Sequence, residues 1–94
     1  MALKTTPFDP AASIETMEDV AYFLEDAFEH GEPGDIAHAL GIVARSRGMT
    51  DLAEKSGMTR QALYKALSPE GNPEFGTIVK VMRALGFRLA PVAA

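Results

Sequence analysis

Two short amphipathic segments around a single glycine constrain the fold of this chain more than any other feature. They occupy residues 51–56 and 60–67 of the stretch DLAEKSGMTRQALYKAL, and Gly57 lies between them. Helices of about six to eight residues are unstable alone, so packing against the rest of the chain must hold both in place. Because Gly57 can adopt the positive backbone angle of a three-residue turn, the stretch predicts a helix-turn-helix.

The small and apolar residues of this stretch face the wedge between its two predicted helices. Ala53 presents almost no side chain where the second helix would cross, and the wedge is filled by Leu52, Met58, Leu63, Ala66 and Leu67. Thr59 precedes the second helix and suits its N-terminal cap. The side chains that remain outward begin at the first position of that helix and are Arg60, Gln61, Tyr64 and Lys65.

An acidic helix is expected over residues 16–30. Thr16 and Asp19 form a capping arrangement at its start, and Gly31 supplies its end. Helical spacing joins the apolar residues of one stripe, which are Met17, Val20, Ala21, Phe23, Leu24, Ala27 and Phe28. The opposite face carries acids with one aromatic residue among them, namely Glu18, Asp19, Tyr22, Glu25, Asp26 and Glu29.

A second helix is expected to begin at Pro33 or Asp35 and to end at Arg47, because Gly48 follows. Its apolar residues share one face, as in a helix with one side against the core. Ile42 falls outside that stripe. It must therefore either be exposed or meet another surface.

Caps and stops also delimit the later helices. Thr50 is expected to cap the helix over residues 51–56. Asn72 is expected to cap a fifth helix, with Pro73 in its first turn and Gly86 at its end. The apolar face of that helix is formed by Phe75, Ile78, Val81, Met82 and Leu85.

These elements predict an all-α fold of five helices in a single domain, since 94 residues enclose one core. Weak alternation over residues 87–92, interrupted by a proline, permits at most a short strand at the C-terminal end. The expected organisation is an extended arm over residues 1–13, the acidic helix over 16–30, a helix-turn-helix core over 34–86 and a tail over 87–94.

Charge is distributed unevenly along the chain. Residues 1–44 contain nine acidic side chains and one lysine, a net charge of −8, whereas residues 45–94 contain eight basic and four acidic ones, a net charge of +4. A basic half favours a polyanion, and an acidic half favours a basic protein. Two different partners are therefore expected.

Several function classes are disfavoured. The chain has no cysteine, no signal-like N-terminus and no apolar run long enough for a membrane span, which predicts a soluble cytoplasmic protein. His30 and His38 lack the spaced partners of a metal site. Residues 71–77 read G-x-x-x-x-G-T without the lysine of a phosphate-binding loop, and no serine has a recognisable base partner. We expect neither an enzyme nor a cofactor.

The arrangement around Gly57 resembles the five-helix, repressor-like helix-turn-helix of phage repressors and small bacterial regulators. The resemblance implies that residues 60–67 lie in the DNA major groove with their first side chains against base edges. Arg60 would then pair with guanine, Gln61 with adenine, and Lys65 with guanine or phosphate. The side chains implied in phosphate contacts are Arg45, Arg47, Thr50, Thr59 and Tyr64.

A wider resemblance covers roughly residues 8–90. The segments ARSRGMT, GMTRQALYKAL and NPEFGTIVKVMRALG look like those of HigA-like antitoxins, the "addiction module antidote" proteins of the XRE type. The resemblance implies a small basic partner toxin of the RelE/ParE type. It also implies that the chain represses its own operon as a dimer on double-stranded DNA. The dimer contact is expected near the C-terminus, through a strand over residues 87–90 or through the last helix around Val79.

The acidic helix fits the toxin-binding task, because negative charge accelerates encounter with a cationic surface. The residues expected to contact the toxin are Glu18, Tyr22, Phe23, Glu25, Asp26, Glu29 and Ile42, with the two aromatic residues and Ile42 as buried anchors. Two alternatives stay open. One is a stand-alone transcription regulator without a toxin, and the other is a protein-binding adaptor that does not bind DNA.

Overall fold

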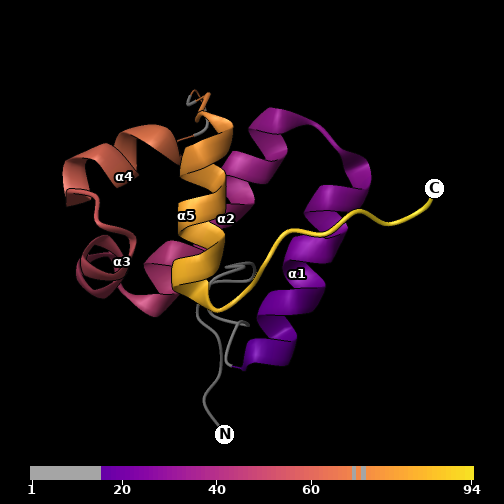
Figure 1. The fold of residues 1–94 in the computed structure, drawn as a ribbon, viewed down its shortest axis with the longest axis horizontal. Helices are drawn as coiled ribbons and strands as arrows, with labels where there is room; N and C mark the ends of the chain where they lie inside the picture. Colours follow the sequence, from indigo (N-terminus) through magenta and orange to yellow (C-terminus); the bar gives the residue numbers. More distant parts are fainter. Residues whose placement is uncertain (1–15, 69, 71) are drawn as a thin grey trace, which may run out of the picture.

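The structure, a computed structural model, describes residues 16–68, 70 and 72–94. This part of the chain is all-α, as predicted, and contains α1 (Met17–His30), α2 (Pro33–Arg47), α3 (Met49–Ser56), α4 (Arg60–Ala66) and α5 (Phe75–Leu85). In Figure 1, α2 passes behind α5, with α1 on one side and the α3–α4 pair on the other. Residues 87–94 form no strand in the single chain, so the short C-terminal strand that the sequence permits is not present. The expected arm lies outside the described residues.

The N-terminal helix begins and ends as its sequence predicts. The backbone N–H of Asp19 donates to the Thr16 hydroxyl and the N–H of Thr16 donates to the Asp19 carboxylate, both at 3.0 Å. Gly31 ends the helix with φ 75°, in the left-handed region that favours glycine. Val20 and Leu24 are buried, and through this stripe α1 packs against α2.

The central helix α2 is buried around most of its circumference. It packs against both α1 and α3. Its buried residues are Ala37, Ala39, Leu40, Gly41, Ile42, Val43 and Ala44. Ile42, only 6% exposed, belongs to the core cluster and so has met another surface. The sequence pattern could not reveal the burial of Ile42, because an apolar stripe indicates a single contact face, whereas α2 contacts other helices on more than one face.

Two predicted caps are wrong. Gly48, with φ 105° and ψ 114°, turns the chain between α2 and α3, and α3 begins at Met49, which leaves Thr50 inside the helix. The earlier start buries the Met49 side chain, which contributes more than a hydroxyl cap. Asn72 caps nothing, since α5 begins at Phe75 with Glu74 at its N-cap. Phe75 itself is 73% exposed and does not join the core, contrary to expectation.

The helix-turn-helix follows the prediction closely. Gly57 has φ 73°, and its N–H donates to carbonyls at the end of α3. The hydroxyl of Thr59 accepts a hydrogen bond from the N–H of Ala62 at 3.0 Å and so caps α4. Leu52, Leu63 and Leu67 are each at most 3% exposed, and these three side chains fix both short helices to the core.

Candidate nucleic-acid interface

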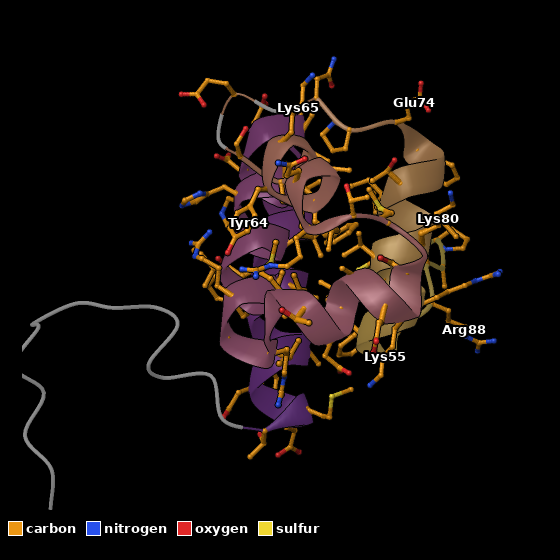
Figure 2. The ribbon with its side chains drawn as sticks, turned by 90° about the vertical axis from the view of Figure 1, so that its left-hand side faces the viewer. Lys55, Tyr64, Lys65, Glu74, Lys80 and Arg88 are labelled. Carbon is orange, nitrogen blue, oxygen red and sulfur yellow. The ribbon has the colours of Figure 1, made fainter. Side chains whose placement is uncertain are left out.

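One face of α4 is polar and open to solvent. The exposed side chains on it are Arg60, Gln61, Tyr64 and Lys65. The opposite face carries Leu63, which is 0% exposed. Because the helix is anchored by its buried side, its polar side is presented on a fixed base (Figure 2). This is the geometry that the sequence predicts for a recognition helix.

Arg60 and Tyr64 contact one another one turn apart on this face. The Arg60 Nη2 donates a hydrogen bond to the Tyr64 hydroxyl at 3.4 Å. The guanidinium carbon lies 5.8 Å from the centroid of the Tyr64 ring, within cation–π range. A guanidinium has five N–H donors, so this contact leaves a donor fork available to a base edge.

The turn before α4 presents a hydroxyl beside this face. The Thr59 Oγ1 accepts from the N–H of Ala62, and the side chain is exposed. A hydroxyl that accepts one hydrogen bond keeps its own hydrogen for donation. Thr59 can therefore cap α4 and donate to a phosphate oxygen at the same time.

Gly41 of α2 sets how closely the end of α4 approaches the core. A Cβ atom placed on Gly41 would lie 2.7 Å from the backbone oxygen of Leu67 and 3.5 Å from the Arg45 Nη1. Real carbon atoms do not approach a carbonyl oxygen so closely, so only glycine fits without movement of α4. The Arg45 guanidinium lies at the same contact, beside the C-terminal end of α4.

Arg47 and Thr50 belong to helices other than α4. Arg47 lines a pocket of about 210 Å³ together with residues of α1, α3 and α5, and α4 contributes nothing to its lining. Thr50 is exposed near the start of α3. The structure thus brings Thr59, Arg60 and Tyr64 together with the rest of α4, whereas Arg47 belongs to another part of the surface.

A second basic cluster was missed by the sequence reasoning. Lys55 of α3 and Lys80 and Arg83 of α5 line one pocket of about 370 Å³. In the view of Figure 2, Tyr64 lies toward the left edge of the molecule, whereas Lys55 and Lys80 lie toward the right. The spacing of Lys80 and Arg83 could have indicated a shared face. Their proximity to Lys55 depends on the packing of α3 against α5 and leaves no sequence signal.

Lys55 also pairs with an acid of its own helix. Its Nζ lies 3.1 Å from the Asp51 carboxylate, one turn earlier, and both side chains are exposed. An exposed pair of this kind contributes little to stability because water and salt screen it. It does reduce the net positive charge of the cluster.

The acidic face of α1 is accessible, as predicted. Its exposed members are Glu18, Tyr22, Glu25, Asp26 and Glu29, and the Tyr22 side chain is 69% exposed. Phe23 is partly buried and packs on the core. Ile42 lies in the core, so in this structure it offers no surface to a partner.

His30 at the end of α1 is held in a negative environment. Its Nδ1 lies 2.8 Å from the Asp26 carbonyl and 3.9 Å from the Asp26 carboxylate. The hydrogen bond to the carbonyl raises the pKa of His30 most, and the charges of Asp26, Glu29 and Asp35 raise it further. His30 therefore lies where the acidic end of α1 meets the acidic first turn of α2.

Other kinds of site are not evident in the described residues. Among them, no helix is both long and apolar enough to cross a bilayer. The same residues contain no group of three or more His, Asp or Glu side chains arranged to hold a metal ion.

Comparison with known proteins identifies a family for this chain. A family model described as "Probable addiction module antidote protein" matches residues 4–93. A Haemophilus influenzae protein described as uncharacterized is 40% identical over 81 residues, which cover 86% of this chain and 84% of the relative. No solved structure gives a significant match. The chain therefore belongs to the family of probable addiction module antidote proteins.

Proposed function

We propose that this chain is the HigA-like antitoxin of a toxin–antitoxin module, which represses its own operon and neutralises a RelE/ParE-like toxin by direct binding. Membership of the antidote family supports the antitoxin role and implies a toxin partner. Antidote proteins of this kind are typically not enzymes, and we propose no catalysis. The cytoplasm is the proposed location, because both partners act there.

The observation that carries DNA binding is the exposed polar face of α4 above a fully buried Leu63. A helix anchored in this way enters the major groove without rearrangement. Arg60 pairs with O6 and N7 of guanine, Gln61 with adenine, and Lys65 with a guanine or a phosphate. Each bidentate pair discriminates against the wrong base by about 1–3 kcal/mol.

Phosphate contacts fix the position of α4 on the duplex. Thr59 and Tyr64 stand beside the base-reading side chains, and Arg45 lies at the other end of the helix. Arg47 and Thr50 are proposed as further phosphate contacts from outside α4, at the end of α2 and the start of α3. The chain acts as a two-fold dimer, since half-sites separated by one turn, about 34 Å, need two copies of α4.

Toxin binding is assigned to the acidic face of α1. Glu18, Glu25, Asp26 and Glu29 attract a cationic surface, and Tyr22 projects among them as an aromatic anchor. Phe23 supports this helix from the core side. Ile42, the remaining residue of the predicted set, is left out because it is buried.

Promoter binding tests the DNA half of the proposal. The full chain is titrated against its own promoter by fluorescence anisotropy at a series of salt concentrations. Affinity of the wild type should fall steeply with salt, because phosphate contacts release counterions. The double variant Arg60→Ala/Gln61→Ala should lose about thirtyfold or more. Lys80→Ala, which removes one positive charge away from α4, is the control and should lose at most about threefold.

The alternatives predict different results. Unchanged affinity of the double variant would favour an adaptor that does not bind DNA through α4. For the toxin half, the product of the neighbouring gene is co-expressed with the full chain and the complex is purified. A stable complex with a basic protein supports the antitoxin, whereas promoter binding with no such complex would favour a stand-alone regulator.

A further inference from the structure

An apolar groove lies where α1 ends and where α2 and α5 begin. It has a volume of about 340 Å³, and seven of its eight lining residues are apolar. Three elements and the C-terminal tail contribute, through Phe28, Pro33, Ile36, Phe75, Ile78 and Leu89. Its size is at the lower end for a small-molecule site and suits one or two large side chains.

Phe75 makes the groove unusual. It is the first residue of α5 and is 73% exposed, although it lines the groove together with Ile36 and Ile78. A phenylalanine left in water forgoes about 1.5–3 kcal/mol of burial free energy. An exposed aromatic side chain beside an open apolar groove is typical of a surface that a partner covers.

Most of the charged residues that adjoin the groove lining along the chain are acidic. Of the residues next in the chain to those that line it, Glu29, Glu32, Asp35 and Glu74 are acidic and exposed, while Arg88 is basic. Glu29 lies in the last turn of α1 and Asp35 in the first turn of α2, and only two residues separate these helices, so both acids lie near the α1–α2 junction. Phe28, in the lining, and Glu29 both lie in the last turn of α1, so the acidic helix α1 contributes directly to the groove.

We propose that this groove docks a segment of a basic protein that presents one large apolar side chain flanked by lysine or arginine. The apolar side chain enters between Phe75 and Ile36, and the flanking cations meet Glu29, Glu32, Asp35 and Glu74. This inference rests on the proposed toxin partner and extends its contact surface from α1 to α5. A second copy of this chain is disfavoured, because it would bring the same acids face to face.

Binding to the neighbouring gene's product tests the proposal with the full chain. Dissociation constants are measured by calorimetry for the wild type, Phe75→Ser and Val92→Ser. Val92 is the matched control, since it is 90% exposed and outside the groove lining. We expect Phe75→Ser to weaken binding by about tenfold or more and Val92→Ser to leave it unchanged. Thermal melting verifies that both variants remain folded.

The charge of the occupant is tested by Glu32→Gln/Asp35→Asn. Its association rate should be several-fold lower than that of the wild type at low salt, and the difference should vanish at high salt. An equal rate at low salt would contradict a cationic occupant. Equal affinity of the wild type and Phe75→Ser would overturn the groove proposal and leave the antitoxin assignment intact.

Two further outcomes are distinguishable. The mass of each variant without partner is measured by light scattering. If Phe75→Ser converts a dimer to a monomer, a second copy occupies the groove and the proposal is wrong. If the wild type itself does not bind the neighbouring product, the proposed toxin partner fails, and the groove proposal fails with it.

Discussion

At the scale of single residues, the proposed DNA binding depends on how the Arg60 side chain is held in the free chain. Its contact with Tyr64, a hydrogen bond of 3.4 Å and a ring contact of 5.8 Å, restrains an otherwise flexible side chain. A side chain that is already restrained loses less entropy on binding. We therefore propose that Tyr64 positions Arg60 for its proposed base contact.

Substitution of Tyr64 separates the two contacts. Tyr64→Phe keeps the ring, so promoter affinity should fall by less than about threefold. Tyr64→Ala removes both contacts and should cost about threefold to tenfold. Tyr22→Ala, an exposed tyrosine of α1, is the control and should bind the promoter as the wild type does. Wild-type affinity of Tyr64→Ala would contradict the positioning role.

His30 gives stability a dependence on pH. Because its pKa is raised in the folded chain, the protonated form is favoured by folding, and this stabilisation is fully present below about pH 6.5. It is lost as pH rises through the folded pKa. The wild type should therefore exceed His30→Ala in Tm by more at pH 5.5 than at pH 8.5. A larger difference at pH 8.5 would contradict the assigned environment.

At the scale of elements, the position of α4 depends on Gly41. The contact with the Leu67 carbonyl lets the end of α4 rest directly on α2. A seven-residue helix has too few hydrogen bonds to be stable by itself, so such contacts decide where it lies. Any side chain at position 41 pushes α4 outward.

Two glycine substitutions test this dependence. Gly41→Ala should destabilise the chain by about 1–3 kcal/mol in urea unfolding, because the clash is with backbone that cannot rotate away. Gly76→Ala is the matched control, since open space surrounds that site in α5, and it should be neutral or stabilising by about 0.4–1 kcal/mol. Equal stability of the two variants would contradict the proposed role of Gly41.

The ends of helices were predictable from glycines and their starts were less so. Gly31, Gly57 and Gly86 adopt positive φ angles where the sequence places helix stops. Thr50 and Asn72 are residue types that often cap helices. However, α3 begins one residue before Thr50, at the buried Met49, and α5 begins at Phe75 with Glu74 as its N-cap. The pocket that Lys55 shares with the basic residues of α5 depends on how α3 and α5 pack, and this packing could not be predicted from the sequence.

At the scale of the whole molecule, opposite charges gather in different parts of the chain. The net charge of −8 in residues 1–44 comes mainly from α1 and the start of α2, whereas the end of α2, α4 and α5 carry the basic side chains that dominate residues 45–94. The sequence predicted this division and the exposed face of α4. It did not predict the apolar groove, because Phe75 was assigned to the core and the groove forms only where three helices and the tail meet.

The central claim is that α4 reads DNA sequence, and the most direct measurement is a preference ratio. Affinities for the chain's own promoter and for a scrambled duplex of equal length are compared for the wild type and for Arg60→Ala/Gln61→Ala. We predict that the double variant keeps its affinity for the scrambled duplex within about threefold and loses most of its preference for the promoter. An undiminished preference in the double variant would contradict the account.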